Sequence, residues 1–582
     1  MKNTLSCLLY VGLLVTIIPL HAQLTNDSSS SSECASCNAC HTSFIAPSSG
    51  DDIVQDFLIP FQPPPEKECF WFRFSTSLKY NQSFLGKRIA QNIFGSDTLN
   101  FIGAQATAND LSKGCLLSAE NFGLSPQSMV SLTLDPSIKR FITRFQLHCG
   151  LDEWVNGWWF KIVLPIEYTQ WDLHACSTTL TTTLNQTPFS GGCVSKNVKQ
   201  SVDPAVNIKT ALSGNFLFGD MLTPWETGHF KFESPDETAL ADVHFYIGFD
   251  LVRRVKHHLG IYLVAVAPTG DNPHVSTVFM PFVGNGHHVE LGAGFDLHRQ
   301  LWHAPDDQIL VFHCAGQATH MFKRYQSRIF DLNNHGCMSR YQLMKAFTQA
   351  DNTFVYKDLI NGVNVLTRHG EITIPIKGEA AFEIRYHHPH GVSAGIGYDI
   401  YGRAREKICN IRPLSSTVGI KGCTPVAVNC FPTTEMNGIP VISSSTVTGT
   451  KTLAATQSNA AIGHCGDTDN AVAQVVTTNP GSVCVNSCTN TTELKVGTQV
   501  ADVAVAQDSN PPLLLQDTQL DINSALAGPQ LSHKMFFHID YTWLSTDWLP
   551  FISFGAEVQV APHHYTSALS QWGVWLQGGF EL

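Results

Sequence analysis

The feature that most constrains this fold is an alternation of apolar and polar residues with a period of two. In FWFRFSTSLKY (70–80), large apolar residues occupy most alternate positions, with polar or charged residues between them. The pattern returns in WWFKIVLPIEY (158–168), DVHFYIGFDL (242–251) and HVELGAGFDLH (288–298). A strand with this period keeps one face in an apolar environment. Faces so rich in Phe, Trp and Tyr favour contact with lipid over the core of a soluble sandwich.

About twelve segments carry this pattern, and each is near the roughly 9–11 residues that a tilted strand needs to cross a bilayer. We therefore predict an all-β fold, a transmembrane antiparallel up-and-down β-barrel of about 12 strands (12–16) with long extracellular loops. The predicted strands are 68–80, 141–149, 157–169, 239–251, 259–267, 288–299, 308–320, 380–388, 392–403, 533–543, 550–561 and 572–582.

The connections between these strands alternate in length, as in outer-membrane barrels with short periplasmic turns and long external loops. An even strand count returns the C-terminus to the periplasm. A soluble all-β sandwich would also alternate along its strands, but it does not explain this alternation of gaps. The short gaps are 150–156, 252–258, 300–307, 389–391 and 544–549, and the longer gaps are 81–140, 170–238, 268–287, 321–379, 404–532 and 562–571.

Composition agrees with a membrane barrel. Charged residues make up 14% of the chain, where roughly 25% is ordinary for a soluble protein. Low charge is expected when one face of every strand meets lipid. The formal net charge of −12 argues against a nucleic-acid partner.

The chain divides into four predicted parts. Residues 1–22 read as a signal peptide, with Lys2 before a short apolar stretch and Ala22 at the cleavage site, so we expect export to the bacterial outer membrane. Residues 23–66 form a periplasmic N-terminal segment, and 67–582 form the barrel. Within the barrel sequence, 404–532 is a large cysteine-rich extracellular insert, and SRYQLMKAFTQA (339–350) predicts a short helix.

Cysteine usage predicts disulfides. The chain has 17 cysteines, an even 16 without the one in the signal segment, and an exported chain meets oxidising conditions. The possible pairs are Cys176 with Cys193 and Cys314 with Cys337. Six further cysteines fall in 404–532, which suggests a small β-rich surface domain stapled by disulfides, with its pairing left open.

Cys37, Cys40 and His41 form the run C-x-x-C-H, the attachment pattern for a c-type haem with two thioether cysteines and an axial histidine. A disulfide, a labile metal site or chance in a cysteine-rich tail are the alternatives. No other cofactor is expected.

Polar residues on the inward face of the predicted strands would line the lumen. In a narrow barrel such charges either pair across the interior or form a polar, mildly cation-favouring channel lining, and both interpretations stay open. The several histidine pairs favour interfacial polar residues, since a metal needs three or four converging ligands. The lumen candidates are Arg73, Lys79, Arg144, Lys161, Glu167, Asp242, His244, Asp250, Glu290, Asp296, Glu383, Arg385 and Asp540.

Three segments, VGNGHHVELGAGFD (283–296), CMSRYQLMKAF (337–347) and GYDIYGRAREKI (397–408), resemble a family of uncharacterised outer-membrane proteins from intracellular bacteria of the Dependentiae type. LGIYLVAVAPTGD (259–271) is similar to porin-like outer-membrane transporters. These resemblances imply barrel topology and an outer-membrane location, and they carry no catalytic residues.

No G-x-S-x-G, H-E-x-x-H or Walker motif occurs, so no enzyme activity is predicted. The favoured function is a porin or passive transporter of small polar solutes. The alternatives are a structural or adhesive surface protein anchored by the barrel, and an electron-transfer barrel with a c-type haem at Cys37–His41. The expected partners are outer-membrane lipid, small solutes and the barrel-insertion machinery, which would recognise the terminal strand WGVWLQGGFEL. The oligomeric state stays open.

Overall fold

The computed structural model describes residues 54–58, 71–103, 115–179, 203–350, 353–421, 512–546, 548–562 and 567–582, with short pieces between 427 and 505. The predicted signal peptide and the C-x-x-C-H run lie outside the described residues.

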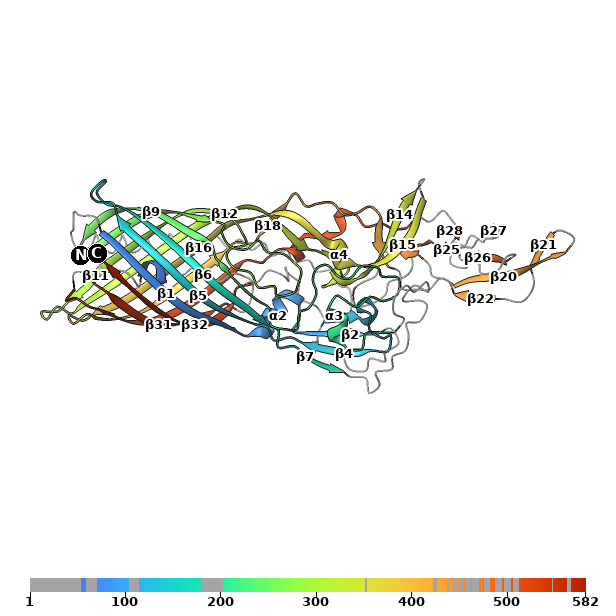
Figure 1. Cartoon of the computed structure of the whole chain (residues 1–582), viewed down its shortest axis with the longest axis horizontal. Coiled ribbons are helices and arrows are strands. Elements are labelled where there is room, and N and C mark those ends of the chain that lie inside the picture. Colours follow the sequence, from blue (N-terminus) through green and yellow to red (C-terminus); the bar gives the residue numbers. More distant parts are fainter. Residues whose placement is uncertain are drawn as a thin grey trace, which may run out of the picture. The chain divides into compact units, whose positions relative to one another are not determined.

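Twelve antiparallel strands close into a barrel, which confirms the predicted fold (Figure 1). Each strand pairs with the barrel strands before and after it in the chain, and the first pairs with the last. Every predicted strand overlaps one of them. The barrel strands are β1 (Trp71–Phe84), β5 (Ser137–Gly150), β6 (Trp158–Asp172), β9 (Val243–Arg254), β10 (His257–Ala267), β11 (Glu290–His303), β12 (Ile309–Ile329), β16 (Thr367–His387), β17 (Val392–Arg403), β30 (Gln530–Thr542), β31 (Phe551–Val560) and β32 (Ser570–Glu581).

The predicted alternation of connection lengths is confirmed. The short connections 151–157, 255–256, 304–308, 388–391 and 543–550 share one end of the barrel, called here the turn end. The long connections share the other, the loop end. β12 and β16 are longer than predicted, at 21 residues each, and they stay paired to Ile329 opposite Thr367. They extend the wall beyond the other strands at the loop end.

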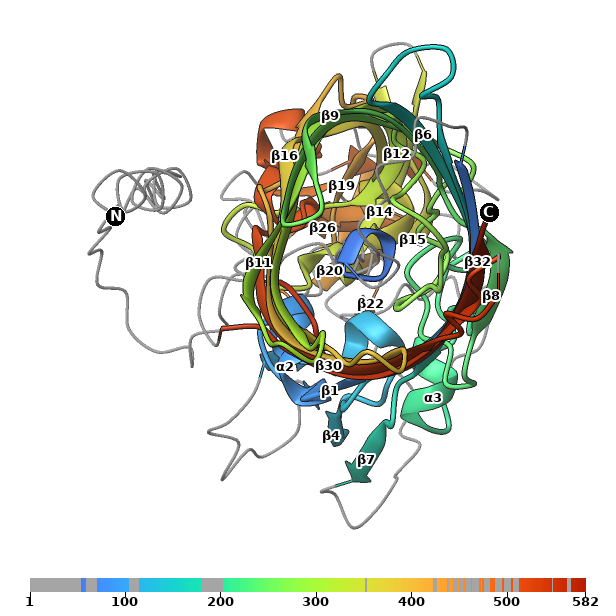
Figure 2. The same cartoon turned by 90° about the vertical axis from the view of Figure 1, so that its left-hand side faces the viewer.

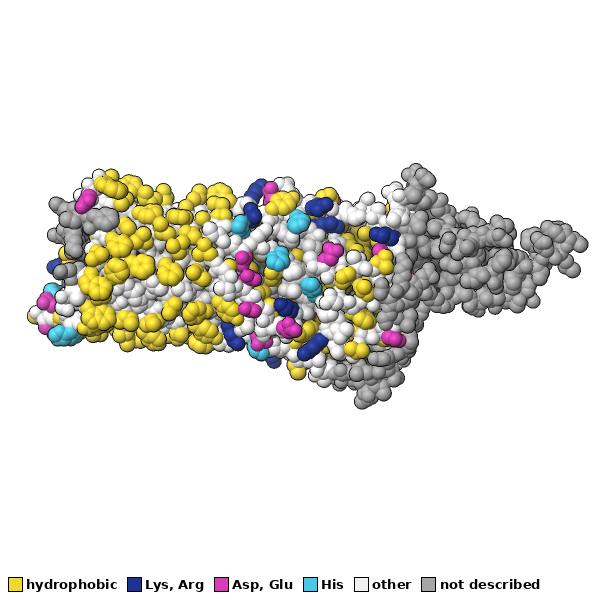
Figure 3. Space-filling view, viewed as in Figure 1, with side chains coloured by type: hydrophobic (Ala, Val, Ile, Leu, Met, Phe, Trp, Pro, Cys, Tyr) yellow, Lys and Arg dark blue, Asp and Glu magenta, His cyan; other side chains and the backbone are white. Residues whose placement is uncertain are grey.

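The outer face of the barrel is apolar and exposed, and Figure 3 shows it as a broad hydrophobic band. Leu263 and Met535 are each 63% exposed. At the turn end the exposed residues include Trp154, Trp302 and Trp548. An apolar band edged by aromatic residues is typical of barrels that span a membrane. Among the described residues, no helix is both long and apolar enough to span a bilayer.

The long connections fold together at the loop end into a domain that we call the cap. One apolar core includes Phe94, Phe122, Trp171, Trp225 and Tyr341, which come from four different connections or strand ends. The elements of the cap are α2 (Gly86–Phe94), β2 (Thr98–Ile102), β3 (Cys115–Ser118), η2 (Ala119–Phe122), β4 (Met129–Thr133), β7 (Cys176–Thr179), α3 (Ile208–Leu212), β8 (Asp236–Leu240), β13 (Asp331–Leu332), η3 (Ser339–Tyr341), β14 (Leu343–Ala350), β15 (Thr353–Asn361), α4 (Gly362–Leu366), β18 (Lys407–Cys409), β19 (Val418–Ile420), η4 (Asp517–Gln519), β29 (Leu520–Asp521) and η5 (Ile522–Ala525).

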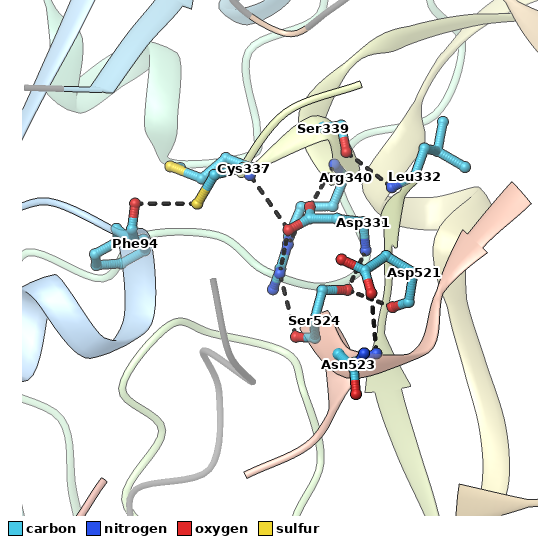
Figure 4. Close-up of polar contacts among 10 residues, drawn as sticks. Phe94, Asp331, Leu332, Cys337, Ser339, Arg340, Asp521, Asn523 and Ser524 are labelled. Carbon is cyan, nitrogen blue, oxygen red and sulfur yellow. Dashed lines mark hydrogen bonds and ion pairs between the residues drawn. The ribbon is translucent and has the colours of Figure 1, made fainter. Parts of the chain in front are cut away.

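Ser524 fastens the predicted insert to a buried ion pair of the cap (Figure 4). Arg340 donates from Nε and Nη2 to the two carboxylate oxygens of Asp331, each at 2.7 Å. The Ser524 hydroxyl donates to Asp521 O and accepts from the backbone N–H of Asp331. Both ends of the 404–532 range therefore belong to the cap, where Val418 and Leu520 share an apolar core with residues 330–366.

The middle of that range holds short strands that pair among themselves. One sheet runs β21-β20-β26-β27, with β22 also on β20. The strands are β20 (Ala427–Met436), β21 (Ile439–Ile442), β22 (Val447–Thr450), β23 (Ala454–Thr456), β24 (Asn470–Val472), β25 (Gln474–Val475), β26 (Ser482–Asn486), β27 (Lys495–Val496) and β28 (Ala504–Val505). That these strands form a separate surface domain stays a prediction.

Two predictions are wrong. The expected helix 339–350 is a single helical turn, Ser339–Tyr341, followed by strand β14, which pairs with β15 and β19. Pairing with two strands overrides the local helix preference. The pair Cys314–Cys337 is absent, since Cys314 is a buried free thiol on β12 whereas Cys115 and Cys337 are disulfide-bonded in the cap. Cys176 is also free, and Cys193 lies outside the described residues.

Candidate functional site in the barrel interior

Most of the charged residues predicted for the lumen are buried and paired with groups on their own strand or on strands one or two places away in the barrel. Where two strands pair in register, inward-facing side chains of opposite charge come within bonding distance. The ion pairs are Arg73 with Glu581, Lys79 with Glu557, Glu167 with Arg140, Glu290 with Lys377, Asp250 and Asp296 with His258, Glu383 with Arg385, and Asp540 with His538.

The remaining predicted residues lie apart from this set. Asp242 accepts from the backbone N–H of Gly270 at 3.1 Å and also from that of Asn285, so it fastens the connection between β10 and β11. His244 Nδ1 lies 3.2 Å from the hydroxyl of Tyr246. Arg144 is half-buried on β5.

A segment that strand periodicity could not place lies inside the barrel. Figure 2, the view along the barrel, shows the short blue helical turn η1 (Val54–Leu58) within the ring of strands. The sequence predicts a periplasmic segment over 23–66, and this part of it is enclosed by the wall. Asp56, Phe57 and Leu58 are all buried.

Phe57 is held by aromatic rings on three strands. Its ring stacks on Tyr262 with centroids 4.7 Å apart and an interplanar angle of 8°, and it meets Tyr246 and Trp159 edge-on. The Lys161 ammonium lies 4.0 Å from the centroid of the Phe57 ring and also donates to Asp56 O. Gln146 donates to the Asp56 carboxylate at 2.8 Å. Apolar, cation–π and hydrogen-bond contacts together fix this turn.

A second contact holds the turn from the opposite side of the barrel. Arg385 Nη2 on β16 donates to Leu58 O at 2.6 Å. Going around the barrel from β6, which carries Lys161, four strands precede β16 in one direction and six in the other. The turn is therefore held between nearly opposite walls, as a bar across the interior.

The free space beside the bar is small. A cavity bounded by Phe57, Trp71, Trp159, Arg73 and Lys161 offers about 50 Å³ to water molecules. A buried water needs at least roughly 10–15 Å³ on this measure, so the cavity holds a few waters and no solute of sugar size. Among the described residues, the bar occupies the interior between Lys161 and Arg385 and bounds this small cavity.

Arg385 is itself held by a charged network on β16 and β30. Its Nε lies 2.9 Å from Glu383 Oε1, and His538 Nε2 lies 2.6 Å from the same oxygen. His538 Nδ1 lies 2.9 Å from Asp540 Oδ1. Gly395 of β17 faces this contact, and a Cβ at that position would collide with both Glu383 and His538. The network comprises two carboxylates, one guanidinium and one imidazole.

A row of histidines on adjacent strands extends this network along the barrel wall. His258, His298 and His313 lie opposite one another on β10, β11 and β12, with ring centroids 5.5 and 5.9 Å apart. His313 lies opposite Glu383 on β16. The histidine pairs of the sequence were expected to be interfacial, but His258, next to His257, bridges Asp250 and Asp296 inside the barrel. No group of three or more potential metal ligands converges within the part of the chain that the structure describes.

Sequence reasoning missed the residues of the bar and its partners Gln146 and Trp159. The bar belongs to a stretch without periodicity, so alternation gives no signal for it. Phe57 beside the acidic Asp56 in VQDFL (54–58) was the one hint of an apolar anchor in that stretch.

Comparisons with known proteins give only weak likenesses. No protein-family model and no curated protein matches the chain. An outer membrane channel from Pseudomonas putida F1 aligns at 7% identity over 88% of this chain and 95% of that one, with a TM-score of 0.33. A deletion mutant of the monoaromatic hydrocarbon channel TodX aligns at 8% identity over 88% and 90%, with 0.29, and a Pseudomonas aeruginosa FadL homologue at 8% over 88% and 88%, with 0.23. At such TM-scores these likenesses carry no argument about function.

Proposed function

We propose that this chain is an outer-membrane β-barrel that passes small polar solutes passively, and that the bar Val54–Leu58 must leave its seat for passage. The observation that carries the proposal is the bar, held between nearly opposite walls of a polar interior by Lys161 and Arg385. A structural anchor needs no removable obstruction, whereas a regulated channel does. The apolar outer band supports the membrane location.

The charged inner wall supports small polar solutes as the substrate class. Its inward face carries paired charges, among them Lys79 with Glu557 at 2.7 Å and Lys534 with Asp399 at 3.1 Å. Such a lining solvates a polar solute and offers an apolar one few contacts. Because both signs are interspersed, selectivity between anions and cations should be weak.

Purified full-length protein in planar bilayers and in liposome-swelling assays tests the proposal. Phe57→Ala removes the stacking on Tyr262 and weakens the seat by about 1.5–3 kcal/mol. At 1.4 kcal/mol per factor of ten, the ratio of open to closed channels should rise roughly ten- to a hundredfold. Conductance should rise accordingly.

The matched control is Phe554→Ala, which removes a ring that is 57% exposed on the outer face. It should leave conductance at the wild-type level. If neither the wild type nor Phe57→Ala passes ions or solutes, the transport proposal fails. If both conduct equally, the bar is not the obstruction.

A surface role is the second candidate, because the cap has an apolar core of its own. Loss of a host-facing interaction on removal of the middle of 404–532, with conductance unchanged, would support it. The c-type haem at Cys37, Cys40 and His41 stays a prediction, and a haem stain with Soret absorbance on native material tests it. The Dependentiae-type resemblance likewise stays a prediction.

A further inference from the structure

The network around Arg385 contains one nitrogen, Nη2, that donates to Glu383 Oε2 at 3.2 Å and has two further possible acceptors. Arg385 Nη2 donates to Leu58 O at 2.6 Å, and it also lies 3.3 Å from His538 Nε2. Whether His538 Nε2 can accept depends on its proton. An Nε2 that carries hydrogen is a donor only, and a bare Nε2 is an acceptor.

The geometry shows which state goes with the seated bar. Both ring nitrogens of His538 face carboxylate oxygens, Glu383 Oε1 at 2.6 Å and Asp540 Oδ1 at 2.9 Å. A carboxylate only accepts, so the ring must donate from both nitrogens and is an imidazolium. The network then carries two positive charges, on His538 and Arg385, and two negative charges, on Glu383 and Asp540. Its net charge within the wall is zero.

We infer that His538 is a proton-operated latch for the bar, closed when the ring carries both protons and open when Nε2 loses its proton. The inference rests on the proposed function. Loss of the proton leaves a lone pair facing Glu383 Oε1 and turns Nε2 into an acceptor for Arg385 Nη2. The two hydrogens of Nη2 are then shared among Glu383 Oε2, His538 Nε2 and Leu58 O, and the hydrogen bond to the bar weakens.

The other groups around His538 define what else titrates nearby. Glu383, Arg385 and His387 face it from β16 and Asp540 from its own strand, while β17 and β31 place Gly395 and Gly555 opposite it. His313 of β12 lies on the far side of Glu383. A pH effect of the latch must therefore be assigned to His538 by substitution.

The first measurement is the conductance of wild-type protein between pH of about 6 and about 9, a window that spans the ordinary titration of histidine. Lys161 also holds the bar, from the opposite wall, so the His538 variant decides which group causes a pH effect. It should rise several-fold with pH. His538→Gln has an amide in place of the titrating ring and should flatten the profile. The matched control is His533→Gln on the same strand, whose ring packs on Tyr398 at the outer face, and it should keep the wild-type profile. A wild-type profile in His538→Gln would overturn the latch.

The second measurement needs no variant and no conduction. Hydrogen exchange of the backbone of 54–58, expressed as protection relative to the free peptide at each pH, should fall as pH rises. Constant protection overturns the latch even if His538→Gln fails to fold. If Phe57→Ala conducts but pH has no effect, transport stands and the latch fails. If protection falls with pH in the wild type and stays constant in His538→Gln, but nothing conducts, the latch stands and transport fails.

Discussion

At the scale of single residues, Gly395 shows how a missing side chain creates the network. It lies opposite His538 in the register of β17 and β30, and opposite Arg385 in that of β16 and β17. A Cβ there would collide with Glu383 Oε1 and His538 Nε2. Glycine therefore leaves room for the carboxylate and the ring to meet beneath the strand.

Gly395→Ala should separate Glu383 from His538 and loosen Arg385. We expect a loss of stability of about 1–3 kcal/mol, the usual cost of an added methyl in a packed interior, together with raised conductance at neutral pH. Gly402→Ala on the same strand is the control, because its Cβ would meet only Gln530 O at 3.9 Å. Thermal unfolding in detergent and single-channel recording measure both effects. Equal behaviour of the two variants would contradict the role of Gly395.

Sequence alternation explains part of this site. A period of two placed Glu383, Arg385 and Asp540 on one face, and the structure buries all three. It could not predict that Glu383 meets His538, because that contact joins strands separated by some 150 residues and depends on register across β17. Register is set by the packing of whole strands rather than by any local pattern.

At the scale of elements, β14 shows where local reasoning fails. SRYQLMKAFTQA has good helix formers, yet Leu343–Ala350 forms a strand because β15 and β19 offer it backbone partners. Leu343, Met344 and Phe347 are buried as the helix prediction also required, so apolar content alone did not separate the two structures.

The same strand buries a lysine. Burial, the largest cause, and the nearby Lys421 lower the pKa of Lys345 to about 7, and Asp220 opposes the shift. In the unfolded chain the pKa of a lysine is about 10.4. Between these values the unfolded state holds more protons, so the stability of the cap rises with pH from about 7 upward.

Lys345→Met should remove this pH dependence and stabilise the cap at pH 7 by about 1–4 kcal/mol, as when buried charges are replaced by apolar residues. Hydrogen exchange of 343–361 measures it. Wild-type protection should be greater at pH 9 than at pH 7, and the variant should be equally protected at both. Lys357→Met, at an exposed position on β15, should behave as wild type. A destabilised Lys345→Met variant would show that the charge is needed.

At the scale of the whole molecule, the barrel could be predicted almost completely and the cap could not. The alternation of apolar and polar residues, together with the lengths of the gaps between segments, indicates that a strand contacts lipid. All twelve strands share that contact. The cap instead arises from contacts among six connections. Ile329 of β12 and Phe94 of α2, for example, belong to one core although 234 intervening residues separate them in sequence. No pattern within a short stretch of sequence predicts a contact between residues so far apart in the chain.

The 404–532 range makes this difference testable. Its composition suggests one independent insert, yet Val418, Ile420, Leu515 and Leu520 belong to the cap core. Ile462 also reaches the cap, since its carbonyl accepts from Ser118 N–H at 2.7 Å. One stretch whose described residues have no such hydrogen bond or core contact lies between Ile462 and Leu513.

Two deletions should therefore behave differently. Replacing 466–510 by a Gly-Ser linker should leave the cap and the barrel folded, because Thr456, Ile462 and Leu513 keep their contacts. Replacing 404–529, which spares β30, removes β18, β19 and β29 and leaves Phe330, Leu332 and Met344 exposed. Its cap should be cleaved rapidly in limited proteolysis while the barrel stays resistant. Equal resistance of the two deletions would mean that the ends of the range do not support the cap, and that its core is complete within 85–366.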